Sequence, residues 1–184
     1  SANHAVRRLT SGAAVTTITS AGQLDTPSGL CVSSDGGSVF VADTNHHRVV
    51  RIFGNQPLAV VAGSAAPGFA DGTGSAASFT HPRGMAMWRA TEIMFVAQVR
   101  TLRSVFAATG ETRTHAGRPG NSSTDLVDGP YGANIVDAAA CSSLAVQPST
   151  GAAYFTHGGT AVRAVGATSR VVTTLAGAGG SSAA

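Results

Sequence analysis

The chain has 184 residues, of which 43% are hydrophobic and 11% are charged. This composition excludes an intrinsically disordered segment, because disordered chains carry more charge and fewer apolar residues, and the length suffices for one sizeable core. The net charge is +3, and all 12 Lys and Arg positions are Arg. The arginines are dispersed rather than gathered into a basic run, so the charge alone does not indicate a nucleic-acid-binding tail. No apolar stretch approaches the roughly 20 residues of a membrane-spanning helix.

The first complete structural unit runs over residues 26–63 and predicts a four-stranded antiparallel sheet. Asp35-Gly36-Gly37 is a hairpin turn signal between its first two strands, and the polar residues 43–47 connect the second strand to the third. A preceding stretch, residues 1–22, supplies only the third and fourth strands of the same kind of unit. The predicted strands of the complete unit are the apolar and β-branched runs 27–32, 39–42, 48–53 and 58–61.

The same unit recurs along the chain. Further units follow near residues 82–117 and 142–177, and each closes on an Ala-Gly pair like Ala62-Gly63. A unit of ~40–45 residues with four short strands is the building block of a β-propeller. We therefore predict an all-β fold, a β-propeller of four-stranded antiparallel blades, with about three and a half blades in a single segment over 1–184. The last residues, 178–184, have the composition of a flexible tail.

Residues 41–52 (VADTNHHRVVRI) resemble the signature of NHL repeats, which are named after an Asn-His-Leu type of tripeptide. Residues 3–9 (NHAVRRL) carry a similar pattern, and residues 68–84 resemble the usual connector between blades of this family. The resemblance covers nearly the whole chain and is weaker after residue 84, where QVRTLR at 98–103 replaces the motif. NHL propellers commonly have about six blades. The resemblance therefore implies a fragment of a longer propeller or, alternatively, a ring that another chain completes.

Strand order determines which loops share a face of such a blade. With four antiparallel strands, the loop between the second and third strands and the connector between blades lie at one end, and the remaining turns lie at the opposite end. Loops on a rigid scaffold are where binding sites concentrate. The candidate binding residues on this face are Asn45, His46, His47, His81, Arg83, Arg100 and Arg118.

Structural roles compete with these binding roles. The motif histidines His46 and His47 are expected to hold the blade turn through hydrogen bonds to the backbone. Asp71-Gly72 and Asp128-Gly129 are expected to form turns. One Arg recurs in each unit and is expected to form an ion pair or a stacking contact rather than to contact nucleic acid. These recurring arginines are Arg8, Arg51, Arg103 and Arg163.

The sequence offers little reactive chemistry. Cys31 and Cys141 do not form a CxxC motif and have no His at a zinc-like spacing, so we expect two buried free thiols, with one disulfide as the alternative. The innermost strands of the three units are apolar and carry no His or carboxylate; they lie at 29–32, 84–87 and 143–146. No catalytic residue, metal ligand or cofactor is therefore predicted.

Three classes of function compete. The resemblance implies a non-catalytic protein-interaction scaffold with a protein partner, and self-association or completion by another chain is a further option. The first alternative is an RNA-binding propeller that uses an Arg-bearing loop face, although aromatic residues for base stacking make up only 5% of the chain. The second alternative is a fragment of a propeller lyase or hydrolase, as some related propellers are.

Overall fold

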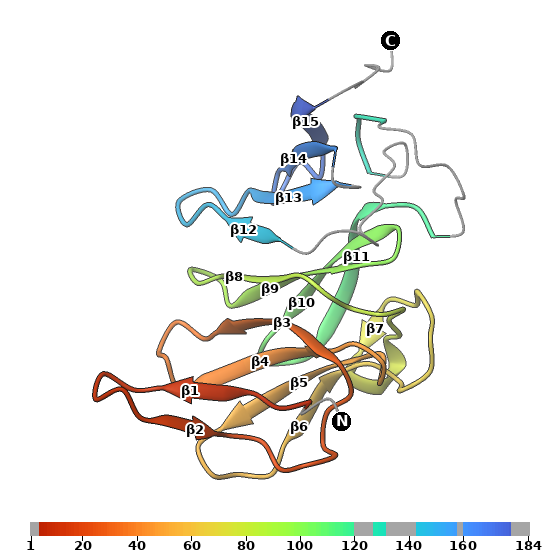
Figure 1. Ribbon diagram of the computed structural model, residues 1–184. Helices are drawn as coiled ribbons and strands as arrows, with labels where there is room; N and C mark the ends of the chain where they lie inside the picture. Colours follow the sequence, from red (N-terminus) through yellow and green to blue (C-terminus); the bar gives the residue numbers. More distant parts are fainter. Residues whose placement is uncertain (1–3, 120–126, 132–142, 158–159, 178–184) are drawn as a thin grey trace.

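Figure 1 shows the computed structural model, which describes residues 4–119, 127–131, 143–157 and 160–177. These residues form four antiparallel sheets and one short 3-10 turn, η1 (Gly74–Ala76). We call the two-stranded first sheet the partial blade and the other three blades 1, 2 and 3. The partial blade contains β1 (Arg7–Leu9) and β2 (Val15–Thr17), and blade 1 contains β3 (Pro27–Val32), β4 (Ser38–Asp43), β5 (Arg48–Phe53) and β6 (Ala59–Ala62). Blade 2 contains β7 (Gly72–Thr73), β8 (Met85–Trp88), β9 (Ile93–Gln98), β10 (Thr101–Phe106) and β11 (Glu111–Gly117). Blade 3 contains β12 (Leu144–Val146), β13 (Ala153–His157), β14 (Ala161–Val165) and β15 (Val172–Gly177).

Each complete blade contains four antiparallel strands that pair in sequence order, and blade 2 gains β7 as a fifth strand at its outer edge. This arrangement confirms the prediction of an all-β fold with four-stranded blades. The tail at 178–184 and the expected start of the last unit at residue 142 lie outside the described residues. None of the helical segments in the described part of the chain has the length and apolar character needed to cross a membrane.

The predicted turn at Asp35-Gly36-Gly37 shows why the strands begin and end where they do. The Asp35 carboxylate accepts hydrogen bonds from the Ser33 hydroxyl at 2.5 Å and from the Gly37 N–H at 2.9 Å. Gly36 has a φ of 72°, a left-handed conformation that glycine adopts without steric cost. The side chain and the glycine together reverse the chain between β3 and β4.

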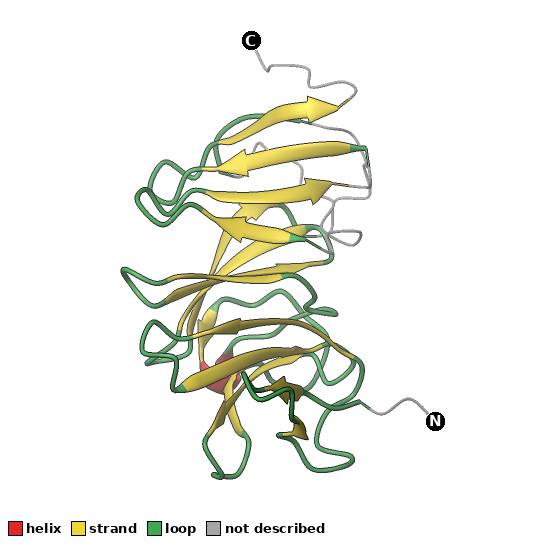
Figure 2. Cartoon of the chain, turned by 60° about the vertical axis from the view of Figure 1, so that its left-hand side comes forward, coloured by secondary structure: helices red, strands yellow, loops and turns green. Residues whose placement is uncertain are grey.

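The hydrophobic core lies between neighbouring blades, which stack face to face (Figure 2). Phe40 and Val49 of blade 1 pack with Met94 and Val96 of blade 2, and Phe79 from the connector joins this cluster. Similar clusters join the partial blade to blade 1 and blade 2 to blade 3. Since each interior blade buries both faces of its sheet, its stability depends on the blade on either side.

Cys31 lies in β3 within the cluster between blades 1 and 2. It is a buried free thiol, as expected, whereas Cys141 lies outside the described residues. Burial raises the pKa of the Cys31 thiol to about 12, and the negative charge of Glu92 adds to this effect. The reactive thiolate therefore does not form near neutral pH.

His115 is a buried titratable group between blades 2 and 3. Its ring contacts Phe95 edge to face, with centroids 4.8 Å apart, and its Nε2 donates a hydrogen bond to the Gly166 carbonyl oxygen at 3.2 Å. Burial lowers the pKa of His115 to about 4; the Gly166 carbonyl opposes this shift and the positive charge of Arg170 adds to it. The folded chain therefore holds His115 neutral at pH 7.

We expect the free energy of unfolding to fall at acid pH because of His115. A histidine whose pKa falls on folding stabilises the native state only above its unfolded pKa of about 6.5, and that contribution is lost as the pH falls toward about 4. Between pH 7 and pH 5, His115 should remove about 2 kcal/mol from the free energy of unfolding, as measured by urea denaturation. In the variant His115→Phe the loss over the same interval should be smaller by about this amount. Equal losses in both proteins would contradict the prediction.

Candidate functional site

The predicted binding loops lie together at one end of the blades. In Figure 1 the hairpin turns between the first and second strands point to the left, and the loops between the second and third strands lie on the right with the connectors. We define the loop face as residues 43–47, 80–83, 98–101 and 117–118. It contains all seven residues that sequence analysis proposed for binding.

Asp43 anchors the loop between β4 and β5 of blade 1. Its carboxylate is fully buried at the end of β4. Oδ2 accepts a hydrogen bond from Arg48 Nε at 2.8 Å and lies 2.8 Å from His46 Nδ1, while Oδ1 accepts the Asp25 N–H at 2.7 Å. All three contacts are internal to the protein, so Asp43 and His46 fix the loop.

Blade 2 keeps this arrangement with different residues. Gln98 occupies the position of Asp43 at the end of its strand, and its Oε1 accepts the Thr80 N–H at 3.0 Å. Its Nε2 donates to Thr101 Oγ1 at 2.8 Å, where blade 1 has Arg48. A neutral pair thus replaces the charged pair of the motif and preserves the same backbone contact, which explains why the motif is lost here while the strand pattern persists.

His47 and His81 form a joint between blades 1 and 2. The His81 N–H donates a hydrogen bond to His47 Nδ1 at 3.2 Å, and the two rings meet edge to face with centroids 4.6 Å apart. Burial lowers the pKa of His47, and the charges of His81 and His46 lower it further. Nδ1 of His47 therefore serves as an acceptor, and the two histidines connect the loop of one blade to the entry of the next.

The remaining candidates lie around this joint. Asn45 is exposed, and its side-chain amide donates to Asp25 Oδ1 at 3.4 Å. Arg83 and Arg118 are exposed cations, one before β8 and the other after β11. Arg100 is half-buried in the β9–β10 loop and has a φ of 63°. The loop face thus combines a fixed centre with exposed polar and cationic side chains.

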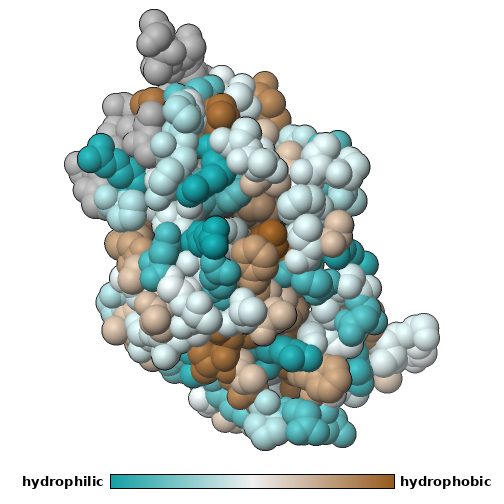
Figure 3. Space-filling view, turned by 180° about the vertical axis from the view of Figure 1, so that it is seen from behind, coloured by the Kyte–Doolittle hydropathy of each residue, from teal (hydrophilic) through white to brown (hydrophobic). Residues whose placement is uncertain are grey.

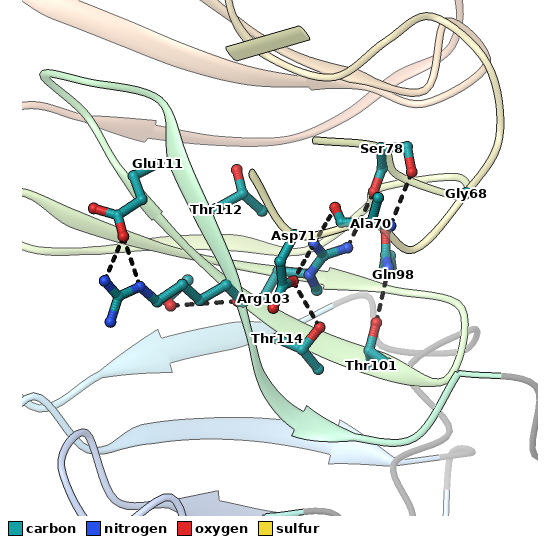
Figure 4. Close-up of polar contacts among 12 residues, drawn as sticks. Gly68, Ala70, Asp71, Ser78, Gln98, Thr101, Arg103, Glu111, Thr112 and Thr114 are labelled. Carbon is teal, nitrogen blue, oxygen red and sulfur yellow. Dashed lines mark hydrogen bonds and ion pairs between the residues drawn. The ribbon is translucent and has the colours of Figure 1, made fainter. Parts of the chain in front are cut away.

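Two of the recurring arginines, Arg103 and Arg163, form the ion pairs expected of them, and their carboxylate partners come from the connectors behind the loop face. Arg103 is fully buried, and its guanidinium donates to Asp71 Oδ1 at 2.7 Å, to the Ala70 carbonyl at 2.8 Å and to the Ser78 carbonyl at 3.1 Å (Figure 4). Thr114 Oγ1 donates to the same Asp71 oxygen at 2.9 Å. Burial lowers the pKa of Arg103, and Asp71 opposes that shift. We call this arrangement of Arg, Thr and a connector Asp a clamp.

Blade 3 repeats the clamp. Arg163 donates to Asp128 Oδ1 at 2.8 Å and to the Val127 carbonyl at 2.6 Å, and the Thr174 hydroxyl donates to Asp128 Oδ1 at 2.8 Å. Burial alone would raise the pKa of Asp128, but hydrogen bonds from Thr174 and Arg163 lower it overall. The clamp therefore attaches each connector to the outer strands of the blade that follows it.

Two sequence-based expectations need correction here. Asp71 and Asp128 were expected to form turns, but their side chains are the acceptors of the clamps. The strand register also places Val50, not Arg51, opposite Val60 at the clamp position of blade 1, and Arg7, not Arg8, opposite Thr17 in the partial blade. Arg51 donates to Ser38 Oγ at 2.8 Å and lies over the Phe53 ring, so it makes the stacking contact expected of it, though at a different position. The β-bulge in each complete blade shifts the pairing by one residue, which spacing along the sequence does not reveal.

The described part of the chain contains no evident metal-binding site. Within it, no three side chains of His, Cys, Asp or Glu converge where a metal ion could bind. The innermost strands β3, β8 and β12 present apolar and small residues. The histidines of the loop face are His46, His47 and His81, and all three contribute to the internal contacts described above.

The succession of antiparallel four-stranded sheets defines a propeller-like fold, and comparisons with known proteins agree. Residues 24–52, from the entry to blade 1 to near the end of β5, match the NHL repeat. This match confirms the resemblance to the NHL repeat over these residues. No curated protein matches the chain.

Several solved structures share the fold. They include the virginiamycin B lyase from Staphylococcus aureus (TM-score 0.61, 14% identity, covering 95% of this chain and 49% of the lyase chain). A gluconolactonase from Xanthomonas campestris is also similar (TM-score 0.63, 18% identity, 96% and 57%), as is a chain of a nidogen–laminin complex (TM-score 0.60, 12% identity, 89% and 52%). The chain spans about half the length of these proteins. At such low identities the likeness shows the fold alone.

We expect removal of one clamp acceptor to destabilise the chain. The variant Asp71→Ala leaves the buried Arg103 guanidinium without its carboxylate and should lower the free energy of unfolding by about 2 kcal/mol in urea denaturation, which is less than for a fully buried pair because the Asp71 side chain is 48% exposed. Glu111→Ala is the matched control, because Glu111 pairs with Arg113, whose side chain is 67% exposed. That exposed pair should contribute less than about 1 kcal/mol. Similar losses for both variants would show that the clamp has no special role.

Proposed function

We propose that the chain is a non-catalytic protein-interaction scaffold and that its partner binds the loop face. The observation that carries this proposal is the joint between His47 and His81, which attaches the loop of blade 1 to the entry of blade 2. A surface that is already ordered before binding loses little conformational entropy when a partner arrives. The joint therefore favours recognition by a rigid surface.

The exposed chemistry of the loop face supports a protein partner that presents carboxylates. Arg83 and Arg118 are exposed there, and guanidinium groups bind carboxylates through paired hydrogen bonds. Asn45 adds an exposed amide to the same face. By contrast, the side of the molecule seen in Figure 3 has hydrophobic residues scattered among hydrophilic ones, without one broad apolar area. A polar, cationic loop face is thus the better candidate for specific contact.

The similarity to a lyase and a gluconolactonase supports the fold and does not assign their chemistry to this chain. The titratable groups of the loop face favour a structural role, because the carboxylate of Asp43 and the Nδ1 atoms of His46 and His47 are engaged in internal contacts. An RNA ligand is a less suitable match, because stacking platforms require aromatic side chains and these make up 5% of the chain. Protein binding through arginines requires no such platform.

Charge reversal on the two ends of the blades tests the proposal. The immobilised chain should retain specific proteins from a nuclease-treated cell extract, as identified by mass spectrometry. The double variant Arg83→Glu, Arg118→Glu should lose at least 90% of that binding, on the order expected when two cations are replaced by anions at an interface. Arg89→Glu is the control, because Arg89 is exposed in the turn after β8 at the opposite end.

Three outcomes separate the candidate functions. Loss of binding in the double variant alone supports the loop face as the protein-binding surface. Equal retention by all three proteins would place the surface elsewhere. If nucleic acid accounts for the captured material, material should be captured only from a parallel extract without nuclease, and that capture should fall steeply between 50 and 200 mM salt; the RNA-binding alternative would then replace the scaffold.

A further inference from the structure

The outer side of the partial blade carries an exposed copy of the clamp position. Arg7 lies directly opposite Thr17 in the β1–β2 pairing, as Arg103 lies opposite Thr114 and Arg163 opposite Thr174. In blades 2 and 3 this Arg–Thr pair binds the Asp of a connector. In the partial blade both residues are exposed. We call this surface the open flank and define it as Arg7, Leu9, Val15 and Thr17.

Two apolar residues of the open flank are likewise exposed, although their counterparts in blade 3 are buried. Leu9 pairs with Val15, at the positions that Val165 and Val172 occupy in blade 3. Val165 and Val172 are fully buried against blade 2, whereas Leu9 is 70% exposed and Val15 is 51% exposed. At the positions where blade 3 contacts the blade before it, the open flank thus has the apolar residues Leu9 and Val15. At the position where blades 2 and 3 bind a connector, it has the cation Arg7.

The connectors of blades 2 and 3 show what such a site accepts. Gly72 of β7 pairs with Thr112 of β11, and Gly129 bridges Val172 of β15. In both cases the residue before the glycine is the clamp Asp, so an Asp-Gly pair adds an extra strand segment along the outer edge of the sheet. A strand that adds to an exposed edge gains backbone hydrogen bonds, and the Asp gives the contact its specificity.

Blade 1 provides an internal control for this reading. The short segment that leads into it, residues 22–26, contains no Asp-Gly pair, and its clamp position holds Val50 opposite Val60. Among the three complete blades, Arg and Thr thus occur together in the two that bind an Asp-Gly connector and are replaced in the one that does not. The presence of Arg7 and Thr17 in the partial blade therefore points to a missing Asp-Gly partner.

We infer that the open flank binds a further propeller blade whose connector carries an Asp-Gly pair. The carboxylate would accept hydrogen bonds from Arg7 and Thr17, the glycine would let the strand lie against β2, and the blade would cover Leu9 and Val15. The described Asp-Gly pairs of this chain are already engaged: Asp71 and Asp128 in their clamps, and Asp35 in its hairpin turn. The occupant is therefore a different polypeptide segment rather than a second copy of this chain.

A peptide that copies the chain's own connector tests this inference. The probe is a synthetic peptide with the sequence of residues 66–79, added at up to millimolar concentration to the isotope-labelled full chain and followed by NMR. Amide shifts are expected at residues 7–9 and 15–17. Replacing the peptide's Asp with Asn, or the chain's Arg7 with Ala, should weaken binding at least tenfold.

The neighbouring residue supplies the control. Arg8→Ala should bind the peptide as the unchanged chain does, because Arg8 pairs with Thr16 and its side chain points to the other face of the sheet. Absence of shifts on the open flank, or equal binding by Arg7→Ala, would overturn the inference. A dimer in light scattering that Leu9→Ser dissociates would also overturn it, because a second copy of the chain would then cover the flank. Arg7 is exposed, so its substitution should leave the fold intact.

Discussion

A guanidinium buried between two sheets must be surrounded by acceptors, because a buried unpaired charge would cost several kcal/mol. The terminal guanidinium nitrogens of Arg103 and Arg163 meet this requirement through hydrogen bonds to a carboxylate and to backbone carbonyls of the connector. The long connectors are thereby attached at a defined point. The position of the loop face follows from this attachment, because the same connectors supply His81 and Arg83 to it. The attachment of the connectors of blades 2 and 3, and with it the placement of His81 and Arg83, thus depends on one type of ion pair.

The repeat pattern allowed the sheets to be predicted, since alternating apolar runs and Asp-Gly turns are local signals. It also placed His47 and His81 on one face, because strand order alone decides which loops are neighbours. An ion pair was expected for Arg103 and Arg163, but its acceptor was not, since each clamp joins residues more than thirty positions apart and nothing local distinguishes Asp71 from a turn residue. The bulges next to Arg103 and Arg163 concealed the true register, so Arg51 was assigned to a position that Val50 occupies.

This fold accounts for the stability of the chain more directly than it accounts for its function. The proteins that share it include a lyase, a gluconolactonase and a component of a nidogen–laminin complex, all at low identity. What they have in common with this chain is the stack of blades, and that stack accounts for nearly all buried residues described above. The loop face differs because its exposed side chains serve no packing purpose. Activity or binding therefore has to be assigned from these side chains rather than from the fold.

The direction of the clamps has a consequence for synthesis on the ribosome. Asp71 precedes Arg103 by 32 positions, and Asp128 precedes Arg163 by 35, so each carboxylate leaves the ribosome before the guanidinium that it binds. A newly made outer strand meets a connector that is already present, and its exposed edge is covered soon after it emerges. Edges that stay uncovered are the places where growing chains associate wrongly. The order of translation therefore protects the stack during assembly, one blade at a time.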